Sequence, residues 1–340
     1  MNGKSFLLFI QKKANSNIII YKRLFIPDFG MKYILLFISV LLLTCCVKKP
    51  CHKDTKSHLE ASQKSSFTLP KIPSIFTSEE QRIEFLSENY WNNFRFQDTA
   101  LVNQPKFLNH LFTNFLGLLS QVPDSVSIKC INHMMSQAEA DSLMYNYFIS
   151  MSEKYLYDPN SPLRNESLYI AVLKNILASN KIDETHKIRP RNHYNTAIKN
   201  RPGKMAADFR YTLATGKQGR LYFIHSSYTL IYFNNPDCGD CKVVKEQMVS
   251  SQVLNNLLQH KKLKILSLYP DKDLSIWSKN YSQLPDSWIR AYDKGTIVQK
   301  KELYDLKAIP TLYLLDKDKK VMLKDAPFEA IENYLSTIKI

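Results

Sequence analysis

The pattern of apolar and polar positions divides the chain into a helical part and a later part in which strands and helices alternate. Between residues 72 and 200, apolar side chains recur every three or four positions, as on one face of an amphipathic helix. The clearest runs start at residues 83, 107 and 168, and two more helices are expected over about 125–135 and 137–155. Thr77 and Glu80 have the spacing of a capping box before the first helix. We expect the basic stretch that ends near Lys204 to be a polar joint.

From Gly203 onward the apolar runs become short and are bounded by turn residues. Residues 209–213 and 219–223, which flank a turn at 215–217, predict a β-hairpin. Buried strands are expected at 228–233, 263–269 and 308–316, and an edge strand at 320–324. A helix is expected after the strand at 228–233 and its turn, and it continues to about residue 260. Two more helices are expected at 274–281 and 328–338, and residues 288–292 form a short apolar stretch. The expected fold is therefore α/β, a mixed sheet with helices on both faces, preceded by an all-α domain.

The N-terminal segment has the features of a secretory signal. After Met31 and Lys32 comes an apolar run of about 12 residues, too short for the roughly 20 residues that span a bilayer. Leu42-Leu43-Thr44-Cys45 resembles a bacterial lipobox, in which the cysteine receives lipid, and the register that lipidates Cys46 is almost as good. We therefore interpret residues 1–46 as an upstream extension and a lipoprotein-type signal peptide, with translation starting at Met31. The alternative is a short buried helix that ends in two cysteines.

Residues 47–71 are rich in Lys, Ser, His, Thr and Asp, which predicts a flexible tether. A tether of this length reaches about 25–30 Å. It would hold a helical domain at 72–200 and a second domain at 203–340 away from a membrane surface.

Length and charge narrow the choice of function. A chain of 340 residues can form roughly two domains. The net charge of +15 comes from scattered lysines without a dense basic helix or an arginine-rich arm, which argues against nucleic-acid binding. The six cysteines do not have the spacing of a disulfide framework for a chain of this length. Cys130 and His133 lack a second pair at metal-ligand spacing, so we expect no metal.

The strongest chemical motif is Cys238-Gly239-Asp240-Cys241, at the predicted start of a helix and directly after a buried strand and a turn. The unpaired N–H groups and the dipole of a helix N-terminus favour a thiolate by about 0.3–1 kcal/mol. We therefore assign Cys238 as the attacking nucleophile and Cys241, one turn further on, as the resolving thiol. A redox-active Cys238–Cys241 disulfide would need no other cofactor.

The stretch from about Gly203 to Ile340 resembles the thioredoxin superfamily, above all the TlpA-like, membrane-tethered thiol-disulfide oxidoreductases. Three matches in the expected order carry this resemblance: Ala206-Ala207-Asp208-Phe209, where the subgroup usually has Ala-Pro-Asp-Phe; the two-cysteine motif; and Ile309-Pro310-Thr311. The helical part resembles, by architecture more than by motif, a domain of unknown function that accompanies such modules in Gram-negative lipoproteins.

The resemblance implies that Pro310 is a cis proline facing the disulfide, and that Ile309, Pro310 and Thr311 present backbone for strand-like pairing with a substrate. This sequence departs from the family at two places. Asp237 replaces the usual tryptophan before the first cysteine, and Tyr232 replaces the usual buried acid, so no general acid or base can be named.

The acids beside the motif indicate a direction of electron transfer. Asp237 and Asp240 flank the thiols, and like charges disfavour the Cys238 thiolate, which destabilises the reduced form. We therefore predict a reductant of protein disulfides, which an upstream thiol reductant returns to the dithiol. Together with the lipobox-like residues, this predicts a protein that is lipid-anchored in the envelope of a Gram-negative bacterium and faces the periplasm. The alternative is a non-catalytic thioredoxin-like binding module that recruits a partner through its helical domain.

Overall fold

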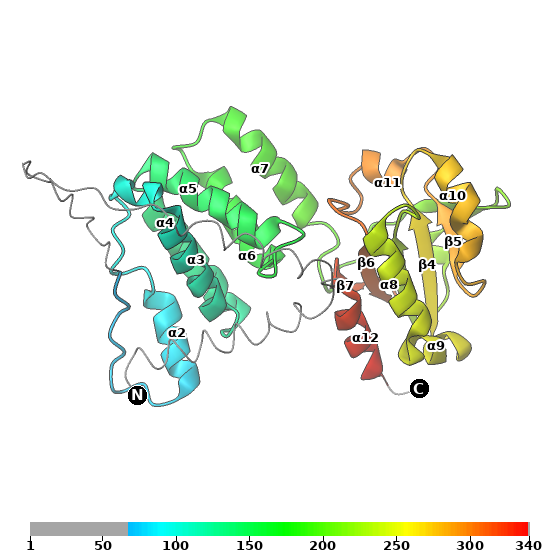
Figure 1. The fold of residues 1–340 in the computed structure, drawn as a ribbon, viewed down its shortest axis with the longest axis horizontal. Helices are drawn as coiled ribbons and strands as arrows, with labels where there is room; N and C mark the ends of the chain where they lie inside the picture. The colour runs from blue at the N-terminus through cyan, green and yellow to red at the C-terminus, as the bar shows by residue number, and fades with distance from the viewer. Residues whose placement is uncertain (1–66, 339–340) are drawn as a thin grey trace, which may run out of the picture.

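The computed structural model describes residues 67–338. The predicted signal segment, Cys45 and Cys46, and most of the predicted tether therefore lie outside the described residues. Within residues 67–338, no helix has both the length and the apolar character needed to cross a bilayer. Figure 1 shows the helices from α2 to α7 gathered on one side of the molecule and the sheet on the other.

The helical region is built from six α-helices with their own core. They are α2 (Glu79–Asn89), α3 (Pro105–Leu119), α4 (Asp124–Ala138), α5 (Ser142–Ser152), α6 (Glu166–Ala178) and α7 (Glu184–Ala197), with a 3-10 helix η2 (Thr99–Asn103) and a π-helical turn η3 (Glu153–Tyr157). Aromatic rings fill the centre of this core: Trp91, Phe112, Phe115 and Phe148 are all buried. The apolar stripes of the sequence therefore do pack together as an all-α unit.

Three details of the helical region differ from the sequence-based expectation. The capping box lies one residue later, at Ser78 and Gln81. The helix expected over 137–155 begins only at α5. There the Asp141 side chain accepts hydrogen bonds from the backbone N–H groups of Leu143 and Met144, and it so caps the start of a new helix. The expected polar joint contains α7, capped by Asp183. Because α7 is polar on most sides, its sequence lacks the regular spacing of apolar residues from which a helix is predicted.

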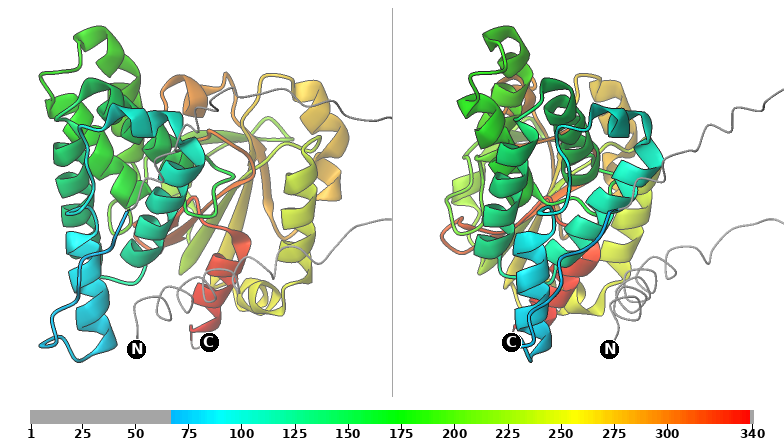
Figure 2. Two further views of the ribbon diagram at one scale, coloured as in Figure 1. Left: turned by 60° about the vertical axis from the view of Figure 1, so that its left-hand side comes forward. Right: turned by 90° about the vertical axis from the view of Figure 1, so that its left-hand side faces the viewer.

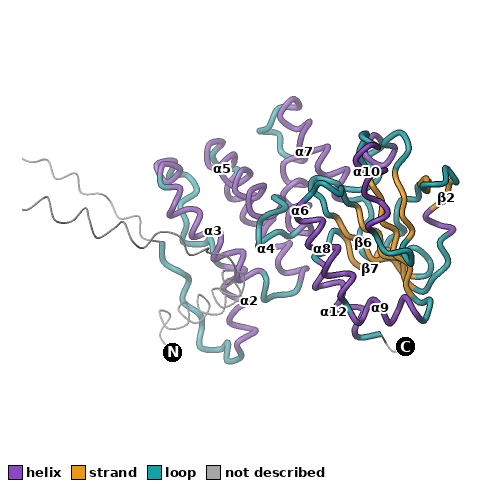
Figure 3. The backbone as a smooth tube through the Cα atoms, turned by 45° about the vertical axis from the view of Figure 1, so that its right-hand side comes forward, coloured by secondary structure: helices purple, strands orange, loops and turns teal. Residues whose placement is uncertain are grey.

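The second region is a seven-stranded mixed sheet. Its strands are β1 (Arg210–Leu213), β2 (Gln218–Arg220), β3 (Tyr228–Phe233), β4 (Leu263–Tyr269), β5 (Ile289–Tyr292), β6 (Thr311–Asp316) and β7 (Val321–Lys324), in the order β2-β1-β5-β4-β3-β6-β7. Strands β3, β4 and β5 are parallel, whereas β6 pairs antiparallel with β3 and β7 with β6. Figure 3 shows these strands packed side by side as one sheet.

Alternation along β3 sends successive side chains to two different cores. Leu230 and Tyr232 face a core closed by α8 (Gly239–Ser250), α9 (Gln252–Gln259) and α12 (Phe328–Ser336). Ile231 and Phe233 face a second core. That core also holds Phe209, Tyr304 and Val298 of α11 (Ile297–Lys300). Helix α10 (Leu274–Asn280) contacts strand β5 through the rings of Trp277 and Tyr292. The views in Figure 2 show the sheet between its own helices and the helical region.

The sheet region also corrects three expectations. The second arm of the hairpin ends at Arg220, and Leu221–Phe223 is a 3-10 turn. The helix after the cysteines breaks at Ser251, whose hydroxyl caps α9 by accepting the Leu254 N–H at 3.1 Å. The apolar stretch at 288–292 is largely a strand, β5, which pairs with β4 and β1.

Polar groups join the two regions, whose buried cores form separate clusters. The Lys324 ammonium, on an edge strand, donates to Glu166 at 2.9 Å and to the carbonyls of Ala197 and Lys199 at 2.8 and 2.7 Å. These three acceptors satisfy all three N–H donors of the ammonium, whose side chain is only 4% exposed. Burial lowers the pKa of Lys324, an effect that Glu166 opposes. Arg201 also binds Glu166, at 2.8 Å.

We predict that Lys324→Met lowers the free energy of unfolding by about 3 kcal/mol, because it leaves two carbonyls and one of the two Glu166 carboxylate oxygens without the donor that binds them. Urea unfolding followed by circular dichroism measures this. Lys320→Met is the matched control, since Lys320 is exposed on the same hairpin, and it should change stability by less than about 0.5 kcal/mol. Equal midpoints for the two variants would contradict a role of Lys324 in joining the regions.

Candidate active site

The two cysteines are placed by the strand β3 and the helix α8. Strand β3 ends at Phe233, and a turn over 234–237 leads into α8, for which Cys238 is the N-cap residue. The Cys238 sulfur accepts the N–H of Cys241 at 3.2 Å. A sulfur therefore takes the position that a serine or aspartate oxygen usually has at a helix start. The free N–H groups and the dipole of the first turn are directed at that sulfur, which favours negative charge there.

The segment Ile309–Thr311 lies directly against Cys238. The Ile309–Pro310 peptide bond is cis, as the resemblance implied. The Cys238 thiol donates to the Ile309 carbonyl at 3.5 Å. Thr311 is the β6 residue that pairs with Phe233 at the end of β3, and its hydroxyl donates to the Ala308 carbonyl at 2.5 Å. Antiparallel pairing of β3 with β6 thus brings residues about 70 positions apart into one site.

The two thiols differ in exposure. Cys238 is half-buried, whereas Cys241 is 2% exposed, and both are free thiols. Burial raises the pKa of the Cys241 thiol, and its hydrogen bond with Cys238 acts in the same direction. At neutral pH Cys241 is therefore a neutral thiol behind an accessible one. This arrangement fits an outer thiol that attacks first and an inner thiol that reacts only when a bond forms at its neighbour.

Tyr232 lies beneath the inner cysteine. Its hydroxyl donates to the Cys241 carbonyl at 2.6 Å, the residue is 1% exposed, and its ring lies perpendicular to that of Trp288. Burial raises the pKa of Tyr232, so it is neutral and its proton is held by a carbonyl. Tyr232 therefore anchors the first turn of α8 and does not replace the buried acid as a base. Its position six residues before Cys238 was the only sign of this role in the sequence.

Two asparagines that sequence reasoning did not single out shape the turn. Asn234, which is 6% exposed, donates to the Ser267 hydroxyl at 2.7 Å. Asn235 donates to Asp271 at 2.8 Å, and its own oxygens accept the N–H groups of Asp237 and Cys238. The turn before the cysteines is thus tied to β4 and the loop after it. Consecutive asparagines in a turn were the only signal available in the sequence.

The two acids of the motif region, Asp237 and Asp240, are both exposed. Asp237 directly precedes Cys238 in the chain, and Asp240 follows it by two residues. Their charges act on the thiols through solvent, where salt weakens such interactions.

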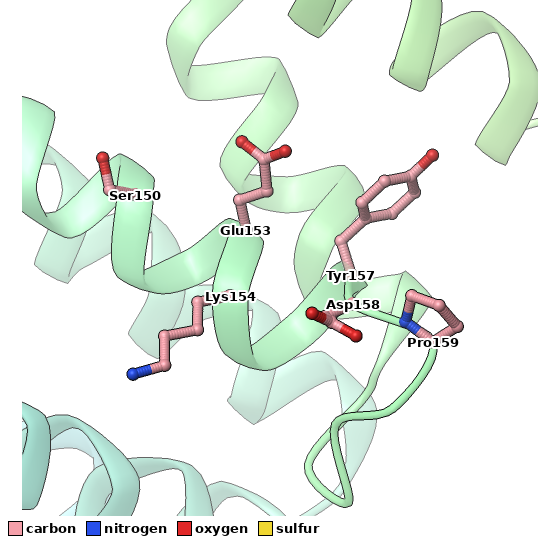
Figure 4. Close-up of a pocket in the computed structure, with 6 residues that line it drawn as sticks. All are labelled: Ser150, Glu153, Lys154, Tyr157, Asp158 and Pro159. Carbon is pink, nitrogen blue, oxygen red and sulfur yellow. The ribbon is translucent and has the colours of Figure 1, made fainter. Parts of the chain in front are cut away.

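Cys130 and a surface cavity lie in the helical region, away from this site. Cys130 is 3% exposed in the core of the helical region, and burial raises its pKa to about 11. A cavity of about 430 Å³ lies beside the turn η3 and is lined by Ser150, Glu153, Lys154, Tyr157, Asp158 and Pro159. Figure 4 shows Glu153 and Tyr157 pointing to one side of this turn and Lys154 to the other. No group of three potential metal ligands occurs within residues 67–338.

Comparison with known proteins defines the class. A family model described as a domain of unknown function, DUF5106, matches residues 45–200. The crystal structure of a thioredoxin-like protein from Bacteroides caccae is 42% identical, covers 81% of this chain and 99% of its own, and superposes with a TM-score of 0.79. No curated protein matches the chain.

Two further solved structures each match about 40% of this chain. The C-terminal domain of an uncharacterized protein from Bacteroides fragilis is 47% identical over 40% of this chain and 98% of its own, with a TM-score of 0.40. The thioredoxin domain of a thiol-disulfide oxidoreductase from Bacteroides vulgatus is 18% identical over 40% of this chain and 96% of its own, with a TM-score of 0.36.

The fold is that of a thioredoxin-like module preceded by a helical region. Because this chain is 42% identical to the thioredoxin-like protein from Bacteroides caccae over nearly all of that protein, it belongs to the thioredoxin superfamily. It is a form that carries an N-terminal helical domain of unknown function.

We predict that iodoacetamide at pH 7.5 modifies Cys238 well before Cys241 or Cys130. The reactive species is the thiolate, and burial raises the pKa of both inner thiols. Peptide mass spectrometry after timed quenching measures each site, and unfolding in urea should make all three react. Modification of Cys241 as fast as Cys238 in the native protein would contradict the assignment of the outer and inner thiols.

Proposed function

We propose that this protein is a thiol-disulfide oxidoreductase that reduces disulfides in other proteins through Cys238 and Cys241. One observation carries the proposal: an accessible thiol at a helix N-terminus faces the Ile309 carbonyl, with a second, buried thiol directly behind it. A structural pair of core cysteines has no need of either an accessible, half-buried sulfur or an opposed backbone carbonyl.

The reaction follows from the positions of the two sulfurs. Cys238 loses its proton to water and its thiolate attacks one sulfur of a substrate disulfide, so that a mixed disulfide forms and the other substrate sulfur leaves as a thiolate, which takes up a proton from water. The Cys241 thiol then gives up its proton, to water or to the departing thiolate, and attacks the Cys238 sulfur. The second substrate thiol is released. The substrate gains two electrons and two protons, and the protein is left with a Cys238–Cys241 disulfide.

Ile309 supplies the docking surface in this proposal. The substrate backbone would pair with Ile309 in strand-like fashion beside Pro310, and its disulfide would displace the Cys238 thiol from the Ile309 carbonyl. Thr311 holds the turn through its bond to Ala308. An upstream thiol reductant would return the Cys238–Cys241 disulfide to the dithiol by the same exchange in reverse.

The cellular setting is part of the same proposal. The lipobox-like residues before Cys45 and Cys46 support a lipid anchor, and the apolar run before them supports export. The protein would then work in the envelope of a Gram-negative bacterium, facing the periplasm, with exported proteins as substrates.

We predict that the protein accelerates insulin reduction by dithiothreitol and that Cys238→Ser does not. The substitution removes the attacking sulfur and leaves the helical region intact. Turbidity from the precipitating insulin B chain reports the rate. A wild-type rate equal to that of Cys238→Ser would contradict the proposed activity. It would favour the alternative, a binding module whose thiols take no part in catalysis.

We also predict that neutralising the acids beside the motif, in the double variant Asp237→Asn/Asp240→Asn, raises the reduction potential. Removing negative charge stabilises the Cys238 thiolate and hence the dithiol, by at most about 30 mV for each unit of thiol pKa change. Equilibration with glutathione buffers, read on the Cys238–Cys241 peptide, measures the potential. Asp318→Asn, at the opposite end of β6, is the control. An unchanged or lowered potential in the double variant would contradict the reductant argument.

A further inference from the structure

The segment that leads into Ile309–Pro310 is attached at its start to the helical region. The Asn200 side chain, only 6% exposed, donates to the Leu303 carbonyl at 2.7 Å and accepts the Ala207 N–H at 2.7 Å. Lys199 donates to the Glu302 carbonyl at 2.8 Å. Both residues directly follow helix α7, so the end of that helix is bonded to the chain just before the active-site segment.

Lys307 lies at the centre of a second attachment. Its ammonium is 2.7 Å from the Asp305 carboxylate and 3.3 Å from the Asp325 carboxylate. It also lies 4.9 Å from the centre of the Tyr157 ring, at a distance at which a cation is attracted to the ring face. The Lys307 side chain is 15% exposed and that of Asp305 is 6% exposed. Two acids of the sheet region and one ring of the helical region therefore hold the same cation.

The helical region presents rigid groups to this cation. The Tyr157 ring stacks on Tyr169 and on His193, with centroid distances of 4.8 and 4.5 Å. Tyr157 ends the π-helical turn η3, seen in Figure 4, and such turns are frequent at functional sites. Arg164 completes the cluster: its guanidinium donates to the Asp325 carboxylate at 2.9 Å and to the Asp325 carbonyl at 2.8 Å.

This cluster borders the active-site segment on both sides. Lys307 is two residues before Ile309, whose carbonyl faces the Cys238 thiol. Asp325 is followed by Ala326, whose N–H donates to the Leu312 carbonyl at 3.3 Å, just beyond Thr311. Movement of the cluster would therefore move the backbone that receives the substrate.

We propose that Lys307 is a positioning residue through which the helical domain sets the place of Ile309–Thr311 against Cys238. This inference rests on the proposed function, because it concerns the surface on which a substrate polypeptide pairs. It gives the helical domain a task in the reaction: with Tyr157 and Arg164 it keeps the docking backbone in the geometry that attack by Cys238 requires. The chemistry of the two sulfurs does not involve Lys307.

The test compares a protein disulfide with a small one. Insulin needs the docking backbone, whereas 4,4′-dithiodipyridine meets the Cys238 thiolate without pairing to Ile309. We expect Lys307→Met to lower kcat/KM for insulin about 10-fold, within the loss that a small misplacement can cause, mainly through KM. Its rate with dithiodipyridine should stay at the wild-type value. Lys307→Arg, which keeps the charge and the contact with the Tyr157 ring, should restore most of the insulin rate.

Two further variants separate positioning from general damage. Tyr157→Leu removes the ring that the helical domain presents to Lys307 and leaves the Lys307 ion pairs in place, and it should lower the insulin rate in the same selective way. Lys301→Met, an exposed lysine on the same connection, should leave both rates unchanged. Equal losses with both disulfides in Lys307→Met, or no loss with either while the wild type is active, would overturn the inference.

Hydrogen exchange on the same proteins distinguishes this inference from the proposed function. Amides in peptides that cover residues 303–312 should exchange faster in Lys307→Met and in Tyr157→Leu than in the wild type or in Lys301→Met. Unchanged exchange would overturn the positioning role whatever the activity. A wild-type protein inactive on both disulfides would overturn the proposed function, and faster exchange in Lys307→Met would still show that Lys307 positions this segment.

Discussion

The active site depends on the placement of one sulfur atom between two backbone segments. The Cys238 sulfur accepts the N–H of Cys241 at the start of α8 and donates its own proton to the carbonyl of Ile309. The first bond requires β3 to lead, through the turn at 234–237, into the start of α8. The second bond requires β6 to lie antiparallel beside β3. The turn asparagines and Tyr232 hold the surrounding chain in place. The order of the central strands is therefore what turns two nearby cysteines into a site with an outer and an inner thiol.

A second set of interactions, all of them polar, ties the helical domain to this site. Lys324, Lys307 and Arg164 each bind a carboxylate at the junction, and each has little or moderate exposure. Ion pairs of this kind add less to stability than an apolar core would, but they are specific in geometry. Their position beside Ile309–Thr311 is the physical basis for the proposed role of the helical domain in placing the docking segment of the thioredoxin-like module.

Much of this could be predicted from the sequence, and the reason lies in the range of each interaction. The strand, turn and helix around Cys238 are local, and they appear in the order that the apolar pattern predicts. The cis Ile309–Pro310 bond could be expected only through the family resemblance. Helix α7 was missed because it has no apolar stripe, and the cap at Asp141 moves the start of one predicted helix from residue 137 to α5.

The interactions that join distant parts of the chain were not predictable from pattern at all. Asn234 meets Ser267, 33 residues away, and Arg164 meets Asp325, 161 residues away. Nothing in the residues near either partner indicates the other, because only the folded topology brings them together.

The central claim is that Cys238 attacks and Cys241 resolves, and capture of a reaction intermediate tests it most directly. Cys241→Ser and Cys238→Ser proteins are mixed with a disulfide-bonded protein, quenched with acid, and analysed by mass spectrometry of the linked peptides. We expect a stable mixed disulfide through Cys238 in the Cys241→Ser protein and none in the Cys238→Ser protein. Capture through Cys241 in the Cys238→Ser protein at a comparable level would contradict it.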